Sequence, residues 1–238
     1  MRNIWTLFKK EFRSYFNSPI AYIFITVFLV VMGWLVMTGF FIENRASMRA
    51  FFGLLPWAFL FFVPAATMRL WAEEKKLGTT ELLMTLPVRD HEVVLGKFLA
   101  SFSFVSLAVA LSFSLPITVA ALGNPDPGPI IGGYLGAFLM GGAYLSIGLF
   151  VSGLTENQIV AFIVGFVLCF LMFIVGAEFV LFSLPHWLVP VFKYLGLGSH
   201  FDSIGRGVID SRDIIYYLSV IGFFLWLNVR WIESRRWA

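Results

Sequence analysis

Six long apolar runs dominate the chain and restrict it to a small set of folds. Each is about 18 residues or longer, which is the length a helix needs to cross a bilayer. Hydrophobic residues make up 59% of the 238 and charged residues only 13%, about half the charged content of a soluble domain. The sequence therefore predicts an all-α integral membrane protein, a single domain over residues 1–238 with six transmembrane helices. The runs are 20–41, 51–68, 93–122, 131–151, 159–182 and 214–231.

The third run is too long for one simple span. It covers about 30 residues, and Pro116 lies near its end. A proline inside a helix removes a backbone hydrogen bond and clashes with the preceding turn. We expect this helix either to project past the membrane or to break at Pro116.

Positive charge is distributed unevenly between the segments that join the runs. With a cytoplasmic N-terminus, 12 of the 17 Lys and Arg residues fall on the cytoplasmic side and 5 on the other. Cytoplasmic segments carry the excess of positive charge, so both termini are predicted to be cytoplasmic. The net charge is only +3, and nucleic acid is therefore not expected as a partner.

Residues 1–18 precede the first run and combine aromatic with basic side chains. Trp5, Phe8 and Phe12 recur at helical spacing among Lys9 and Lys10. This pattern predicts an amphipathic helix that lies in the headgroup layer. The alternative is a frayed cytoplasmic extension.

The segment 69–97 holds ten of the charged residues and interrupts two apolar runs. Its part 69–92 is predicted to be a cytoplasmic region in contact with a soluble partner. Arg69 should continue the second span as a polar helix that stops at Gly78. Thr79 can then cap a short helix over 80–86, and Asp90 the next one, with Glu92 in its first turn.

The short helix over 80–86 carries Leu82, Leu83 and Leu86 on one side. These leucines can pack on the preceding helix or fit a groove on a soluble partner. The remaining alternative is a solvated loop without a partner.

Small residues recur four apart in the fourth run, as in Gly132/Gly136 and Gly142/Ser146. Such spacing lets helix backbones approach closely. We interpret it as a packing surface, within one protomer or between two, rather than as a substrate groove.

Segment 183–213 should lie on the outer side as short helices at or dipping into the interface. Glu178 is the clearest ionisable residue within an apolar run. It is either a pathway or proton-relay residue, or an outer-surface acid paired with Lys193 or Arg206. The candidate pathway or outer-surface residues are Glu178, His200, Asp202, Arg206 and Asp210.

The sequence carries no recognisable catalytic signature. It has neither a G-x-x-x-x-G-K-[ST] phosphate loop nor an H-E-x-x-H zinc motif. Ser199 and His200 are adjacent but lack a G-x-S-x-G context, so we predict a local polar pair instead of a hydrolase triad. The 3 His and 1 Cys show no ligand spacing, and neither a bound metal nor a catalytic role is expected.

Three stretches carry a resemblance to a known family. EEKKLGTTELL at 73–83, followed by LPV at 86–88 and GK at 96–97, resembles the cytoplasmic stretch of type-2 (ABC-2) ABC exporter permeases. FNSPIAY at 16–22 and RGVID at 206–210, with HF, RD and YYL around it, are similar to the gliding-motility (Gld-type) permeases.

This resemblance implies six spans, an amphipathic N-terminal helix and an outer re-entrant region between spans five and six. It implies a dimer, homomeric or with a close paralogue, in the bacterial inner membrane. Two ATP-binding subunits would bring ATP and Mg, and this chain would bind no cofactor. An extracytoplasmic accessory protein is a further candidate partner. The residues that would contact the ATPase are Glu73, Glu74, Gly78, Thr79, Thr80, Glu81, Leu82 and Leu83.

Two other classes of function stay open. One is a membrane scaffold of a motility or envelope complex that uses 183–213 to bind an extracytoplasmic partner without transport. The other is a secondary carrier, which the scarcity of buried acids disfavours. The leading hypothesis is an ATP-driven exporter permease whose cargo the sequence does not identify.

Overall fold

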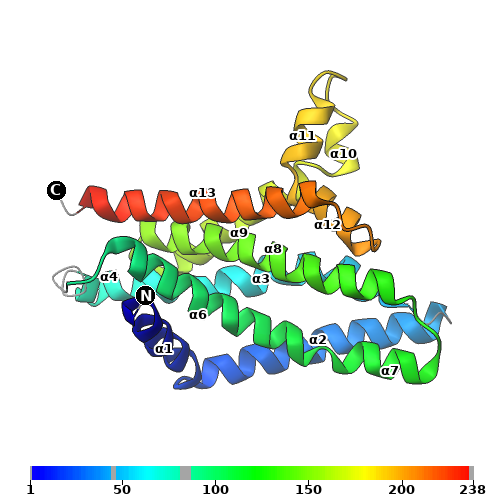
Figure 1. Ribbon diagram of the computed structural model, residues 1–238, viewed down its shortest axis with the longest axis horizontal. Helices are drawn as coiled ribbons and strands as arrows, with labels where there is room; N and C mark the ends of the chain where they lie inside the picture. The colour runs from blue at the N-terminus through cyan, green and yellow to red at the C-terminus, as the bar shows by residue number, and fades with distance from the viewer. Residues whose placement is uncertain (1, 44–46, 81–86, 236–238) are drawn as a thin grey trace.

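The protein is built from helices. The computed structural model describes residues 2–43, 47–80 and 87–235, and within those ranges it contains no strand. This confirms the all-α prediction (Figure 1). The helices are α1 (Arg2–Phe16), α2 (Pro19–Glu43), α3 (Arg49–Thr67), α4 (Arg69–Lys76), α6 (Asp90–Leu111), α7 (Ser114–Leu122), α8 (Pro127–Leu154), α9 (Gln158–Ile174), α10 (Glu178–Leu181), α11 (Val189–Leu195), α12 (Leu197–Gly205) and α13 (Ser211–Arg235).

Five helical segments of the described chain are long and apolar enough to cross a membrane. α9 is apolar but has only 17 residues, so the six-span layout stays a prediction. Large side chains point outward from these helices, including Trp34 on α2 and Ile163 on α9. An apolar outer surface of this extent is unfavourable in water and favourable in lipid. The five segments are Pro19–Phe40, Arg49–Lys76, Asp90–Leu122, Pro127–Leu154 and Ser211–Ser234.

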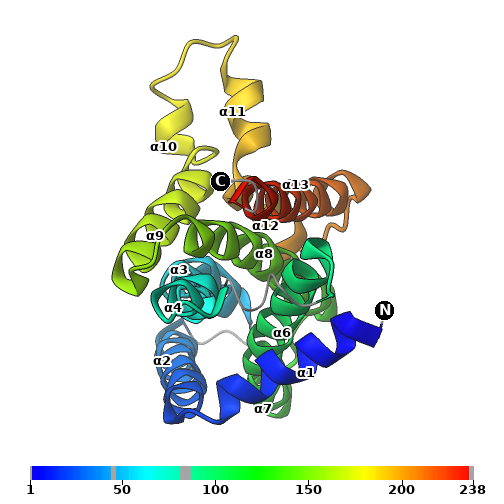
Figure 2. The ribbon, with the colours of Figure 1, turned by 90° about the vertical axis from the view of Figure 1, so that its left-hand side faces the viewer.

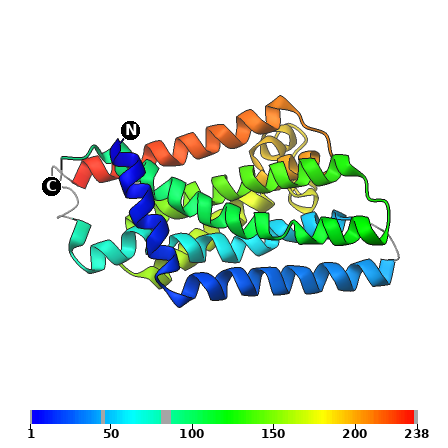
Figure 3. The ribbon, with the colours of Figure 1, turned by 60° about the horizontal axis from the view of Figure 1, so that its bottom comes forward.

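Both chain ends, α1, α4 and the start of α6 lie at one end of the bundle, which we call the terminal end (Figures 1 and 3). α10, α11 and α12 lie toward the opposite, far end. Both termini therefore lie at the same end of the bundle, as the predicted orientation with both termini on one side of the membrane requires. Which side of the membrane the terminal end faces stays a prediction.

α1 lies across the terminal end at a steep angle to the long helices (Figure 3). It packs mainly on α6 and α2. At Gly96 on α6, a Cβ would lie 2.8 Å from the Cβ of Leu7, so only glycine permits this close approach. The helix predicted for residues 2–16 is confirmed, and its place in the headgroup layer stays a prediction.

The fifth apolar run was predicted as one span over 159–182, and this is wrong. α9 ends at Ile174, and the chain turns before α10 begins at Glu178. A Cβ at Gly176 would lie only 3.0 Å from the Cα of Gly196. Just after the end of α9, the chain thus packs closely against the backbone before α12, and glycine at both positions permits this approach.

The third apolar run breaks as expected, but four residues before Pro116. α6 ends at Leu111, and α7 begins at Ser114. Pro116 therefore lies in the first turn of α7, where its missing N–H is tolerated. The carbonyl of Ser112, which a residue at position 116 would normally bond, accepts a hydrogen bond from the Tyr134 hydroxyl at 3.2 Å.

α8 is the central helix and packs against α3, α6, α9, α12 and α13. Its small residues face neighbours of the same protomer. Gly136 faces Phe201, and Gly141 faces Phe59. The predicted packing surface is thus used inside the protomer.

Gly148 on α8 gives the sharpest packing prediction. A Cβ there would overlap the hydroxyl of Thr67 on α3, whereas a Cβ at Gly222 on α13 meets nothing within 4 Å. We expect Gly148→Ala to lower the free energy of unfolding by about 1–3 kcal/mol through overpacking. Gly222→Ala should instead raise it by up to about 1 kcal/mol, because alanine is the better helix former. Thermal unfolding of both variants in detergent measures the difference, and equal midpoints would contradict the packing argument.

Segment 183–213 contains short helices, as predicted. α10 and α11 project sideways from the bundle near its far end, and α12 returns the chain to α8 and the start of α13 (Figure 2). We call the projecting segment 178–195 the lateral arm. It exposes Phe182 at 94% and Trp187 at 75% of their surface.

Candidate functional site

The predicted coupling region begins on α4. Glu73 and Glu74 lie on this helix, with Glu73 exposed and Glu74 half-buried. The helix ends as predicted, since Gly78 has a φ of 69° and the amide of Leu77 donates to the carbonyl of Glu73. Helical conformation resumes at Thr79 and Thr80. Glu81, Leu82 and Leu83 lie outside the described residues.

Two residues predicted to cap helices in this region, Thr79 and Asp90, do not occupy the N-cap positions expected for them. Thr79 is itself helical, and its hydroxyl donates to the carbonyl of Glu74 at 3.2 Å, so it serves the end of α4. Asp90 is the first residue of α6 and Arg89 is the N-cap. The cap is made by Glu92, whose carboxylate accepts from the Arg89 amide at 3.2 Å and from the Asn3 side chain at 3.1 Å.

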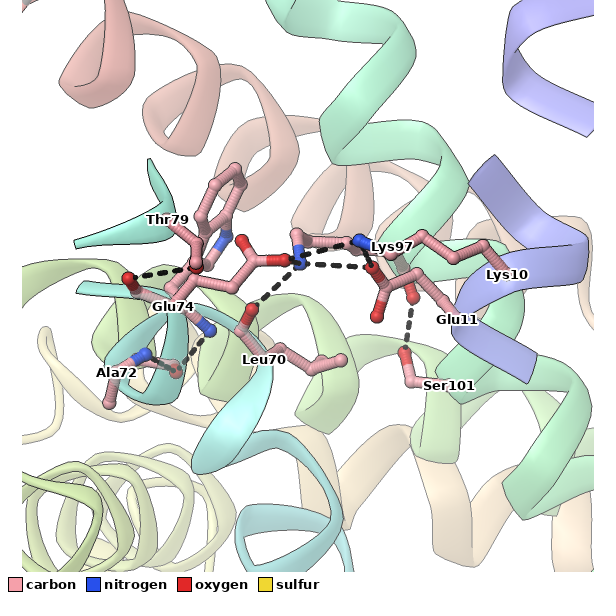
Figure 4. A network of polar contacts seen from close by, with 10 residues as sticks. Lys10, Glu11, Leu70, Ala72, Glu74, Thr79, Lys97 and Ser101 are labelled. Carbon is pink, nitrogen blue, oxygen red and sulfur yellow. Dashed lines mark hydrogen bonds and ion pairs between the residues drawn. The ribbon is translucent and has the colours of Figure 1, made fainter. Parts of the chain in front are cut away.

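The most unusual feature of the terminal end is a buried lysine. Lys97 on α6 has only 2% of its side chain exposed. Its Nζ lies 2.7 Å from Glu74 Oε1 on α4 and 3.3 Å from Glu11 Oε1 on α1 (Figure 4). It also donates to the Leu70 carbonyl at 2.8 Å. A buried ammonium requires such partners, since desolvation without them is very costly.

A second cation balances the charge. Lys10 Nζ lies 3.4 Å from Glu11 and 3.8 Å from Glu74, with 60% of its side chain exposed. We call Lys10, Glu11, Glu74 and Lys97 the charged junction. It joins α1, α4 and α6 through interactions that are short-ranged and directional, so a displacement of α4 must either carry the other two helices with it or break an ion pair.

The backbone around the junction is also fixed. Ser152 on α8 accepts from the amides of Trp71 and Ala72 at 3.1 and 3.2 Å and donates to the Met68 carbonyl at 2.9 Å. Tyr15 on α1 donates to the Ala66 carbonyl at 3.0 Å. Burial raises the pKa of the Tyr15 hydroxyl, so it stays a neutral donor. The Ser152 bonds hold the start of α4 against α8, and the Tyr15 bond holds the end of α3 against α1.

A cavity of about 480 Å³ opens beside the junction, between α1 and α4. Glu73, Glu74 and Thr79 of the predicted coupling region line it together with Arg69 and Glu11. The structure therefore brings three of the five described coupling residues to the cavity beside the junction. Charged side chains around an open cavity can receive a complementary side chain from a partner.

Glu11 and Lys97 were not predicted as site residues. The sequence marks each of them as unusual, since Glu11 is the one acid in a basic helix and Lys97 lies inside an apolar run. Their meeting across 86 positions had no signal in the sequence.

A second candidate site is a cavity of about 760 Å³ near the far end, between α9, α10, α11, α12 and the start of α13. We call it the far-end pocket. Glu178, His200, Asp202 and Arg206 line it, as does the unpredicted Asp213. The structure thus gathers four of the five candidate outer residues.

The fifth, Asp210, has a structural role instead. Its Oδ1 accepts from the Arg212 amide at 2.9 Å at the start of α13, as an N-cap residue does. Glu178 lies after the end of α9, in the first turn of α10, and its side chain is exposed, which agrees better with the outer-surface alternative than with a residue inside a span. Its role at the pocket stays a prediction.

His200 and Asp213 form a buried pair. His200 Nδ1 lies 2.7 Å from Asp213 Oδ1, and Nε2 lies 2.8 Å from the Tyr194 carbonyl. Asp213 Oδ1 and the Tyr194 carbonyl oxygen can both accept a hydrogen bond from a ring N–H. The ring also stacks on Tyr216, with centroids 4.0 Å apart.

The Ser199–His200 pair is local, as predicted. The Ser199 hydroxyl donates to the carbonyls of Lys193 and Gly196 at 2.5 and 2.8 Å. With both His200 nitrogens engaged elsewhere, the ring does not activate this serine. Nearby, desolvation raises the pKa of the Asp202 carboxyl although the residue is exposed; Arg206 lowers it and Glu178 raises it.

The sequence matches the model of a known protein family. The model of a family described as ABC-2 family transporter protein matches residues 6–229. No curated protein matches the chain. The matched range includes the charged junction and every residue named above as lining the far-end pocket.

Proposed function

Because the chain belongs to the ABC-2 transporter family and is thus a multi-pass membrane permease component of an ABC transporter, we propose that it couples ATP hydrolysis by a separate subunit to export. The observation that carries this proposal is the charged junction. It connects α4, which leads into the predicted coupling segment, to α6 and α1. A force that the ATP-binding subunit exerts on segment 79–86 would therefore reach α1 and α6 through α4.

The finer assignment follows the resemblance. We place the protein in a bacterial inner membrane with both termini cytoplasmic, as one of two permease protomers on two ATP-binding subunits. These subunits would hold ATP and Mg. The gliding-motility subgroup is part of this proposal and rests on the stretches at 16–22 and 200–218.

The test is co-purification. The chain, tagged and extracted in mild detergent with an ATP-binding subunit from the same genome, should retain that subunit and alter its rate of ATP hydrolysis. A chain that retains no ATP-binding subunit under these conditions would contradict the proposal.

The lateral arm favours a second candidate function, that of a non-transporting membrane scaffold. The arm projects from the bundle (Figure 2), and its exposed Phe182 and Trp187 suit contact with an extracytoplasmic accessory protein, as a non-transporting scaffold would require. A cargo that changes the ATPase rate of the reconstituted complex would count against the scaffold and for the exporter.

A further inference from the structure

The far-end pocket lies at the level where the membrane helices end. Phe173, near the end of α9, forms part of its wall, and Asp213 in the first turn of α13 forms another part. α13 is membrane-length from Ser211 onward. The mouth of the pocket is therefore at the height of the lipid headgroups.

The charges of the pocket are mixed and close to balanced. Glu178, Asp202 and Asp213 are acids. Lys193 and Arg206 are cations, and the His200 ring faces two acceptors. A ligand that carries one charge only would meet both repulsive and attractive groups, whereas a zwitterion can satisfy both kinds.

Asp213 indicates what the cationic part of the ligand must offer. The residue is 7% exposed, and its Oδ1 is bonded to His200. Its Oδ2 is buried and accepts no hydrogen bond from any described part of the chain. An unsatisfied buried carboxylate oxygen is costly and favours a ligand with N–H donors. A primary ammonium has such donors and a quaternary ammonium has none.

The anionic part is matched by Arg206 at the end of α12 and by Lys193 on α11. Guanidinium binds phosphate oxygens through paired hydrogen bonds, and lysine adds a point charge. The rest of the wall includes Leu181, Pro190 and Val208, which suit the apolar part of an amphiphile.

The lateral arm adds aromatic anchors beside the mouth. Phe179, Phe182, Trp187 and Tyr194 are exposed. Trp and Tyr concentrate at membrane–water interfaces, so the arm suits a place among headgroups.

We propose that the far-end pocket binds the headgroup of a zwitterionic phospholipid that carries a primary ammonium. The phosphate contacts Arg206 and Lys193, and the ammonium faces the acidic side formed by Asp202, Glu178 and Asp213. This inference depends on the placement of the protein in a membrane and not on the ATPase partner. Its test is therefore independent of the test of the proposed coupling.

Native mass spectrometry of the purified chain in detergent tests the proposal. The probe is dihexanoyl phosphatidylethanolamine, compared with the phosphatidylcholine and phosphatidylglycerol of the same chains and with inorganic phosphate. We expect the ethanolamine lipid to bind at least about fivefold more tightly than either other lipid, because only it supplies both phosphate and ammonium N–H groups.

Two exposed positions allow variants that should fold. Arg206→Gln should weaken binding of the ethanolamine lipid about tenfold, while Arg212→Gln, an exposed arginine outside the pocket, should not. Asp202→Asn should remove most of the preference over the choline lipid. Its control is Asp210→Asn, because asparagine still caps α13.

Three outcomes would overturn the proposal. Equal binding of the three lipids would exclude headgroup recognition. Inorganic phosphate bound as tightly as the ethanolamine lipid would make this a site for free phosphate. Unchanged lipid binding in both Arg206→Gln and Asp202→Asn, with unfolding midpoints like the wild type, would place the lipid elsewhere.

Discussion

Lys97→Met is expected to lower the free energy of unfolding by about 3 kcal/mol, the lower end of the range for breaking a buried ion pair. The methionine has similar volume, so packing is largely kept and the loss reports on charge. Without the ammonium, the Glu11 and Glu74 carboxylates lose their buried cation and face Lys10, which is 60% exposed. We take the lower end because 18% of the Glu74 side chain is exposed and water can partly solvate its carboxylate.

The measurement is the unfolding midpoint in detergent, with Lys76→Met as the matched control. Lys76 lies on α4 and is exposed, so its replacement should change the midpoint little. The double variant Lys97→Met/Glu74→Gln should recover part of the loss, because one of the stranded carboxylates is neutralised. A Lys97→Met midpoint equal to that of Lys76→Met would show that the junction does not hold α1, α4 and α6 together.

Glu81→Lys and Leu82→Asp are each expected to abolish retention of the ATP-binding subunit while leaving membrane insertion intact. Both residues lie in the segment outside the described residues, directly after the helical turn that begins at Thr79. Charge reversal at position 81 replaces attraction with repulsion, and an aspartate at position 82 places a charge on the apolar face proposed to dock. The readout is the amount of ATP-binding subunit that co-purifies with the tagged chain.

The control for these variants is Glu233→Lys, which makes the same charge change at the terminal end but outside the insert. Glu233 is 41% exposed and lies 3.1 Å from Arg230 on α13. This variant should retain the subunit. Normal retention by both Glu81→Lys and Leu82→Asp would refute the coupling assignment.

Several local features were predictable from the sequence. The stop of α4 at Gly78 follows from the ease with which glycine adopts a positive φ, and the structure confirms it. The short helices of 183–213 follow from prolines and polar residues that cannot continue a span. These predictions depend on neighbouring residues only, which explains why they succeed.

Two site assignments needed the folded chain. The sequence placed Glu178 near the outer end of the fifth apolar run and left a pathway role and an outer-surface role open, whereas in the structure α9 ends at Ile174 and Glu178 begins α10. Asp213 looked like an ordinary residue near a helix start. Its burial beside His200 appears only when α12 returns to α13.

The sequence by itself determined the class of this protein, its membrane-length helices and the charged insert, because hydrophobic length and helix signals are local properties of the chain. Only the tertiary structure decided which charges meet. Lys97 lies 86 positions from Glu11, and the free energy of burying its ammonium depends on both carboxylates reaching it at once. That dependence on several helices is not encoded in any one stretch of residues.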